Sequence, residues 1–333
     1  MSPGNTLLRV EDLSVRARLG SRVFNIVEQA SFSLRRGEVL GLVGESGSGK
    51  SVTCRAILRL LPGANLSIPE GRILFDGRDF TAMSEADIRA ERGASVGMIF
   101  QNPASHLDPV MSIGDQVAES IVLHRGVSRA EAWGQAIDLL RQVGIPDPAR
   151  RARGYAHEFS GGMRQRAMIA AALACDPQLL IADEPTTALD VTVQAQILRL
   201  LLDLRDKRGL SIILVTHDLG VVAQACDSIA VMYGGRIVET GPKRDVLKAP
   251  FHPYTARLIA CQPNHSLAAQ GAGSGLLPSI PGQPPSAGDM PPGCRFHPRC
   301  DLAQARCRES MPELVTRAPH HLAACPVTAE VQP

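Results

Sequence analysis

The sequence predicts an α/β fold in which a mainly parallel sheet is covered by helices. Short apolar runs typical of buried strands alternate with amphipathic segments typical of helices. A glycine-rich loop over 44–51 lies between a predicted strand and a predicted helix, and another apolar run over 178–182 is followed by two acids. Both features are typical of folds that bind ligands at the carboxyl ends of parallel strands.

Composition sets broad limits on the class of protein. The chain has 333 residues, of which 44% are hydrophobic and 20% are charged, and a formal net charge of +2. This length predicts two or three packed units, and the balanced charge does not favour nucleic acid or anionic lipid as a partner. No run reaches the roughly 18 apolar residues of a membrane span, and residues 1–25 lack the apolar core of a signal peptide. We therefore expect a cytosolic chain unless a partner holds it at a membrane.

Apolar patterns give the order of the predicted elements. Strands are expected over 7–10, 30–34, 39–43, 71–75, 96–100, 178–182 and 210–216, and helices over 52–61, 160–176 and 192–208. Residues 102–158 have a mostly helical pattern, and Gly209 fits the C′ position after the last of these helices. Residues 262–293 are dense in Pro, Gly, Ser and Ala, which indicates a linker or an irregular wrap.

The loop between the third strand and the first helix predicts a phosphate site. Its residues are Gly44, Glu45, Ser46, Gly47, Ser48, Gly49, Lys50 and Ser51. They fit the P-loop pattern G-x-x-x-x-G-K-S in its required context between a strand and a helix. Glycines let the backbone curl so that N–H groups point at phosphate oxygens, and the next helix presents its positive end. Lys50 supplies a cation to the β and γ phosphates, and Ser51 supplies a hydroxyl to Mg²⁺.

Acidic residues after the apolar run over 178–182 complete an ATP-hydrolysing site. Asp183 is placed to hold Mg²⁺ through water, and Glu184 to orient or deprotonate the attacking water. His217 ends a later strand at the same predicted edge, where it could touch the γ-phosphate. Without a P-loop, a solvated strand end and a structural histidine would be the ordinary interpretations.

A second anion site is predicted at a helix start. Ser160 is a good N-cap, and Gly161 and Gly162 expose backbone N–H groups. With Phe159 and Met163 they resemble the signature of the ABC ATPases, although that family usually has Gln where Met163 stands. One ATP cannot easily use both anion sites of one chain, so two chains that face each other are expected.

Other landmarks of the ABC family follow in order. Gln101 resembles the Q-loop glutamine that contacts Mg²⁺ or water, residues 188–190 with Asp190 resemble the D-loop, and His217 resembles the switch histidine. Phe24 is the candidate for stacking on adenine, with a strand-core role as the alternative. The resemblance implies a RecA-like parallel core, an N-terminal antiparallel β part and a helical subdomain over about 102–160.

The segments 101–109, 159–166 and 252–255 narrow the resemblance to the ATPases of oligopeptide and dipeptide importers, a family that includes nickel importers. It implies an ATPase domain over 5–260 and a C-terminal extension over 261–333. It further implies a second, paralogous ATPase, two permeases, an indirectly coupled substrate-binding protein and a peripheral position on the cytoplasmic face of the inner membrane. Alternatives are an importer of another substrate such as nickel, a soluble ABC ATPase acting on nucleic acid or ribosomes, and an ATP-binding adaptor. The single motif set and the lack of sustained heptads argue against the soluble ATPase, and the presence of both Glu184 and His217 argues against the adaptor.

Four of the eight cysteines crowd into the last 40 residues: Cys294, Cys300, Cys307 and Cys325. From the residues alone, the four cysteines could be either ordinary thiols or zinc ligands, although no close C-x2-4-C pair typical of zinc is present. Spacing does not select an iron–sulfur cluster either. The resemblance to the importer ATPases implies that these cysteines hold a [4Fe–4S] cluster, with a structural role in a tail that can bury little core.

Overall fold

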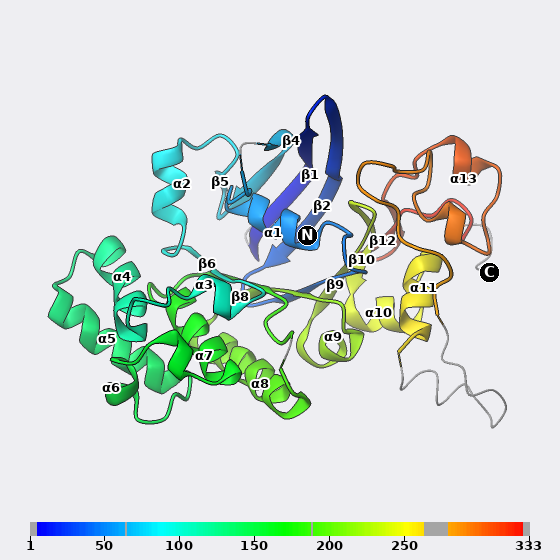
Figure 1. The fold of residues 1–333 in the computed structure, drawn as a ribbon. Helices are drawn as coiled ribbons and strands as arrows, with labels where there is room; N and C mark the ends of the chain where they lie inside the picture. Colours follow the sequence, from blue (N-terminus) through cyan, green and yellow to red (C-terminus); the bar gives the residue numbers. More distant parts are fainter. Residues whose placement is uncertain (1–4, 64, 188, 263–278, 329–333) are drawn as a thin grey trace, which may run out of the picture. The chain divides into compact units, whose positions relative to one another are not determined.

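The computed structural model describes residues 5–63, 65–187, 189–262 and 279–328, which divide into two compact units (Figure 1). Unit one is formed by the described residues of Met1–Arg35, Val39–Thr81 and Thr216–Pro333, and unit two by Arg36–Glu38 and Ala82–Val215. The amino-terminal strands, the P-loop and the carboxyl-terminal extension therefore belong to the same unit.

Unit one begins with an antiparallel sheet of order β2-β1-β4-β5. Its strands are β1 (Thr6–Leu19), β2 (Arg22–Arg35), β4 (Leu66–Phe75) and β5 (Arg78–Asp79). The predicted N-terminal antiparallel part is confirmed, but β1 and β2 are much longer than the predicted strands. Shifts in the β1–β2 register between Val10 and Leu13 break the alternation of apolar residues, so the pattern beyond Val10 does not indicate a strand.

The remaining strands of unit one carry the P-loop. The fully buried β3 (Val39–Val43) pairs in parallel with β9 (Ser228–Tyr233), which pairs antiparallel with β10 (Arg236–Pro242). Helix α1 (Lys50–Ile57) starts two residues earlier than predicted and ends at Ile57, four residues before the predicted end. The other helices of this unit are α9 (Leu219–Ala225), α10 (Lys243–Lys248), α11 (Pro253–Ala260) and α13 (Arg306–Glu309).

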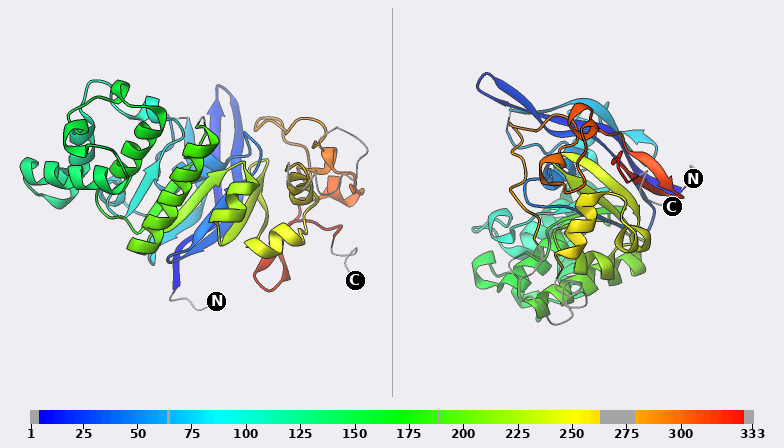
Figure 2. Two further views of the ribbon diagram at one scale, coloured as in Figure 1. Left: turned by 90° about the horizontal axis from the view of Figure 1, so that it is seen from below. Right: turned by 90° about the vertical axis from the view of Figure 1, so that its right-hand side faces the viewer.

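The carboxyl-terminal extension contains strands that the sequence pattern did not predict. β12 (His321–Ala323) pairs with β10, and β11 (Val315–Ala318) pairs with β12. These strands are only three and four residues long, too short for an alternating pattern to be seen. Figures 1 and 2 show the orange and red extension beside β10 and the yellow helix α11. Residues 279–293 have an irregular path, as predicted, while the rest of the predicted linker includes 263–278, which lie outside the described residues.

Unit two contains parallel strands that are buried along their whole length. β7 (Leu179–Asp183) lies between β6 (Val96–Ile99) and β8 (Ser211–Thr216). This burial on both faces explains their continuous apolar runs. The helices are α2 (Glu85–Glu91), α3 (Pro103–His106), α4 (Ile113–Arg125), α5 (Arg129–Gln142), α6 (Pro148–Arg151), α7 (Gly161–Ala172) and α8 (Val191–Arg208), with a 3₁₀ turn over Ala156–Glu158.

Helix ends in unit two follow the predicted capping. The Ser160 side chain accepts a hydrogen bond from the Met163 N–H at the start of α7, and Gly209 ends α8 with a φ of 64°. Within the described parts of both units, no helix is long and apolar enough to span a bilayer.

Candidate functional site

The P-loop connects β3 to α1 through glycines with positive φ. Gly44, Gly47 and Gly49 have φ values of 154°, 78° and 104°. A Cβ on Gly44 would lie 2.1 Å from the carbonyl oxygen of Met232, a distance that real Cβ atoms do not reach. Gly44 is therefore required both for its backbone conformation and for the close approach of β9.

The side chain of Lys50 lies inside the curve of this loop. Its Nζ donates to the carbonyl oxygens of Gly44 (2.8 Å) and Glu45 (2.9 Å), and the residue is buried. Gly49 at the N-cap of α1 provides no side-chain cap, so the first N–H groups of the helix are not capped by it. A cation and a helix N-terminus thus meet at one concave stretch of backbone, which suits a phosphate. Ser51 is the second residue of α1 and is half-buried.

Two further P-loop residues are held by other parts of unit one. The Glu45 N–H donates to the hydroxyl of Tyr254 (2.9 Å), and the Ser48 carbonyl oxygen accepts from the Gly235 N–H (2.9 Å). Burial raises the pKa of Tyr254, so its hydroxyl keeps its proton at neutral pH. The Glu45 carboxylate forms an ion pair with Arg299 of the extension at 2.7 Å.

The acidic part of the site lies in unit two. Asp183 is the last residue of β7 and is fully buried. Glu184 follows with a φ of 47°, which is uncommon for a residue other than glycine. Its Oε2 accepts from Gln101 Nε2 (2.8 Å) and from Thr187 Oγ1 (2.9 Å). The predicted Q-loop glutamine and the predicted base are therefore in direct contact.

The predicted signature and the predicted D-loop are neighbours in the same unit. Asp190 is the N-cap of α8 and accepts from the Val193 N–H at 2.9 Å. A Cβ added to Gly162 would lie 2.9 Å from Val193 Cγ1, and one added to Gly161 would lie 3.6 Å from Leu189 Cδ2. Glycine at 162 thus lets α7 start close to α8. Ala188, the first residue of the predicted D-loop, lies outside the described residues.

The remaining predicted residues belong to unit one. His217 is exposed directly after β8, and Phe24 is half-buried on β2 opposite Ala17. A Cβ added to Gly288 would lie 3.9 Å from the Phe24 ring, so that ring neighbours the extension. The residues predicted for one ATP site are thus divided, with the P-loop, Phe24 and His217 in unit one and the rest in unit two.

The four clustered cysteines line a single small cavity in the extension. The Cys294 N–H donates to the Cys307 carbonyl oxygen (2.8 Å), and all four thiols are free. Burial raises the pKa of Cys294 to about 11, which keeps the thiol protonated at neutral pH when no metal ion is bound. Across the described ranges, no three His, Cys, Asp or Glu side chains are arranged to hold a metal ion. The four cysteines therefore share one cavity, but their described side chains are not arranged as a metal site.

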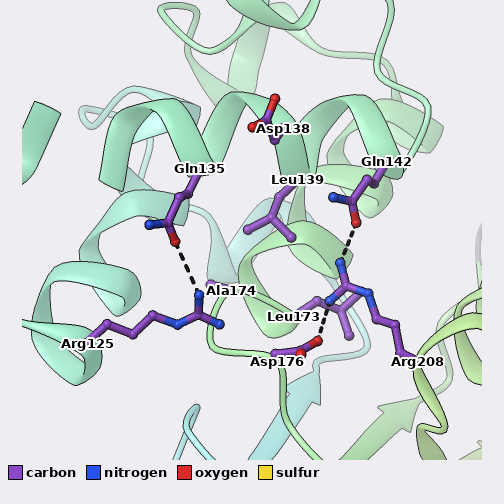
Figure 3. A pocket seen from close by; sticks show the side chains of 9 residues that line it. All are labelled: Arg125, Gln135, Asp138, Leu139, Gln142, Leu173, Ala174, Asp176 and Arg208. Carbon is purple, nitrogen blue, oxygen red and sulfur yellow. Dashed lines mark hydrogen bonds and ion pairs between the residues drawn. The ribbon is translucent and has the colours of Figure 1, made fainter. Parts of the chain in front are cut away.

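A larger cavity, of about 400 Å³, lies within unit two and is lined by none of the motif residues. Figure 3 shows Arg125 turned toward Gln135, and Arg208 placed between Gln142 and Asp176. These contacts tie α5 to the ends of α4 and α8. The cavity is thus bridged by structural side-chain pairs and separate from the predicted chemistry.

Sequence reasoning missed three residues that contact the site. Thr187 binds Glu184 from three residues along the chain, and Tyr254 binds the P-loop from α11. Arg299 binds Glu45 across 254 residues. Only Thr187 had a local signal, a hydroxyl one turn after the predicted base.

Two family models match the chain. The ABC transporter model matches residues 27–187, and the model of the oligopeptide/dipeptide transporter C-terminal region matches residues 238–307. A protein of Sinorhizobium fredii described as a probable peptide ABC transporter ATP-binding protein, y4tR, is 50% identical over 96% of this chain and 94% of its own length. The dipeptide transport ATP-binding protein DppD of Escherichia coli is 47% identical over 92% of each chain.

Solved structures support the same fold. The dimeric post-hydrolysis state of the ATP-binding cassette MJ0796, bound to ADP and Pi, aligns with a TM-score of 0.64 and 25% identity. The alignment covers 72% of this chain and 99% of that one. The cbiO1 protein of Clostridium perfringens, part of the ABC transporter complex cbiONQ, aligns with a TM-score of 0.63 and 28% identity. That alignment covers 74% of this chain and 92% of the cbiO1 chain. The predicted fold class is confirmed.

Proposed function

Because the chain belongs to the family of ABC transporter ATP-binding proteins, we propose that it is the ATP-hydrolysing subunit of a peptide importer. The observation that carries this proposal is the near-full-length likeness to dipeptide transport ATP-binding proteins, at 44% and 47% identity. The contact between Gln101 and Glu184 supports a hydrolytic rather than a purely regulatory role.

The chain's own residues account for the chemistry as follows. The P-loop N–H groups and Lys50 bind the β and γ phosphates and stabilise the charge that develops on them. Glu184, held by Gln101 and Thr187, orients or deprotonates the attacking water. Ser51, Gln101 and Asp183 are the residues that would hold Mg²⁺, which supplies further positive charge at the phosphates. His217 is the candidate contact to the γ-phosphate, and Phe24 the candidate support for adenine.

The signature residues belong to a partner's ATP site in this proposal. Ser160, Gly161 and Gly162 present a helix N-terminus, and Asp190 lies at the start of the adjacent α8. A chain with two anion sites suits a facing pair of ATPases, and we propose that the second ATPase is a different chain. Two permeases would hold the pair at the cytoplasmic face of the inner membrane, and a binding protein would deliver the peptide. The proposed division is an ATPase domain over 5–260, with a helical part over 102–160, and an extension over 261–333.

Reconstitution tests this function. When the chain, a second ATPase and both permeases are assembled in vesicles, peptide-loaded binding protein is expected to stimulate ATP hydrolysis and peptide uptake. The control is the same assembly with unloaded binding protein. Absence of stimulation in the complete assembly would contradict peptide import. Full activity without the second ATPase would contradict only the heteromeric arrangement.

We also propose that Cys294, Cys300, Cys307 and Cys325 hold a [4Fe–4S] cluster, with zinc as the alternative. The support is chemical: four thiols line one cavity, and four cysteine thiolates are the ligand set of such clusters. A bound cluster would cross-link a segment that has only short strands and little apolar core.

Metal analysis checks this proposal. Protein purified without oxygen is expected to contain about four iron and four sulfide per chain, as the cluster formula requires. Cys307→Ser should lose most of the iron because it removes one of four ligands. Cys175→Ser, outside the cluster, should keep it. Stoichiometric zinc without iron would show that the four cysteines form a zinc site. If the protein contains neither iron nor zinc, the four cysteines are ordinary thiols.

A further inference from the structure

The guanidinium of Arg299 is fully engaged at the P-loop. Its Nη1 and Nη2 donate to the two carboxylate oxygens of Glu45 at 2.7 and 3.0 Å. Nη1 also donates to the Tyr233 hydroxyl (3.3 Å), Nη2 to the Ile280 carbonyl oxygen (3.4 Å) and Nε to the Pro281 carbonyl oxygen (2.8 Å). The pair with Glu45 is bidentate, the geometry that fixes a carboxylate in both position and orientation.

This ion pair is largely removed from water. The exposed fractions of the two side chains are 5% for Arg299 and 25% for Glu45. Its interaction is therefore screened much less than that of a surface pair. Removing Arg299 would leave a half-buried carboxylate without its cation, inside the loop that has to bind the negatively charged phosphates.

A second arginine of the extension, Arg295, contacts the turn that holds the other end of the P-loop. Arg295 donates to the Gly234 carbonyl oxygen and forms an ion pair with Glu28. The next residue, Gly235, donates its N–H to the Ser48 carbonyl oxygen at 2.9 Å. The extension therefore contacts the loop directly at Glu45, and through one intervening turn at Ser48.

Three aromatic rings stiffen this connection. Ring centroids of Tyr233 and Phe296 are 5.2 Å apart, and those of Tyr254 and Phe296 are 5.4 Å apart. Tyr254 accepts the Glu45 N–H, and Tyr233 accepts from Arg299. The Tyr233 and Tyr254 rings are themselves 4.5 Å apart, so Phe296, which lies between the two arginines in sequence, packs against both and holds the turn against the loop.

We propose that Arg299 is a positioning residue of the ATP site: it holds and neutralises Glu45 so that the P-loop keeps the shape and charge that bind phosphate. The extension then contributes to nucleotide affinity, in addition to any part it has in assembly. This inference rests on the proposed ATPase function, because Arg299 acts through Glu45 and not on ATP itself.

The test separates neutralisation from a merely structural role. In the full-length chain carrying Glu184→Gln, which prevents turnover, Arg299→Ala is expected to raise the Kd for Mg·ATP about tenfold, the order expected from one uncompensated charge near the phosphates. Glu45→Gln alone should weaken binding less than Arg299→Ala does, because it loosens the contact that holds the loop but leaves no unneutralised carboxylate there. The double variant should recover most of the lost affinity, and Arg299→Lys should lie between Arg299→Ala and the parent.

Arg308→Ala is the matched control, because Arg308 is an exposed arginine of the same extension. It should leave the Kd unchanged. If Arg299→Ala binds Mg·ATP like the parent, or if Glu45→Gln fails to restore affinity in the double variant, the proposal is overturned. If Arg299→Ala is unfolded in a thermal melt, Arg299→Lys takes its place, because it keeps a cation but loses the bidentate contact with Glu45. Parental Mg·ATP affinity in a folded Arg299→Lys variant would then overturn the proposal. Absence of Mg·ATP binding by the parent would instead contradict the ATPase function.

Discussion

Glu184→Gln is expected to lower ATP hydrolysis by about 10²–10⁴-fold, the usual effect of losing a positioned base. The amide keeps the size of the side chain and can still accept a hydrogen bond, but it no longer takes a proton from water. Hydrogen bonds from Gln101 and Thr187 converge on Glu184 Oε2, so the turn itself should remain in place. Steady-state phosphate release from the assembled transporter is the measurement.

ATP binding distinguishes this variant from a P-loop variant. Glu184→Gln should bind ATP with nearly the parental Kd and accumulate as the ATP-bound pair of subunits. Lys50→Ala should instead weaken binding, since it removes the cation that faces the phosphates. If Glu184→Gln hydrolyses ATP at the parental rate, Glu184 is not the catalytic base.

Gly44→Ala is expected to have an effect of similar size, but on binding. The new methyl group would meet the Met232 carbonyl oxygen at 2.1 Å, and the φ of 154° is unfavourable for alanine. The loop must therefore shift away from β9, which misplaces its N–H groups. Loss of two charge-assisted phosphate contacts, each worth about 1.5–3 kcal/mol, weakens ATP binding on the order of 10²–10⁴-fold. Equilibrium titration with Mg·ATP measures it.

Gly37→Ala is the control that distinguishes backbone strain from the steric clash expected in Gly44→Ala. Gly37 has a φ of 71°, and no atom lies within 4 Å of a Cβ built on it. Gly37→Ala should cost about 1–2 kcal/mol of stability through its left-handed backbone and leave the Kd for ATP unchanged. Parental ATP affinity in Gly44→Ala would show that the observed loop conformation is not the one that binds the nucleotide.

Local chemistry explains which parts of the structure could be predicted. The P-loop, the acidic strand end and the signature depend on short segments, where glycines, caps and apolar runs have a direct physical meaning. Gly209 and Ser160 take the predicted cap positions for that reason. Gln101 and Glu184 are each predicted from their own segments, but the direct contact between them is not.

Long-range pairing could not be predicted in the same way. Tyr254 lies in the segment 252–255 that supports the family resemblance, but neither it nor Arg299 has a local pattern that points to the P-loop. Only the folded chain places them there. The strands β11 and β12 are too short to show alternation, and the register shifts of β1 hide its length. The metal ligands of the extension remain a prediction, since the described side chains show a shared cavity without a metal-binding arrangement.

The ion pair between Glu45 and Arg299 has a consequence for synthesis on the ribosome. The two residues are separated by 254 positions, so the P-loop leaves the ribosome long before its cation is made. At about 5–20 residues per second, the interval is roughly 10–50 s. During that time the nascent ATPase carries an unneutralised carboxylate in its phosphate loop. The loop also needs Met232 and Gly235 to take its conformation, so nucleotide affinity should reach its final value only late in translation, after Arg299 has been made.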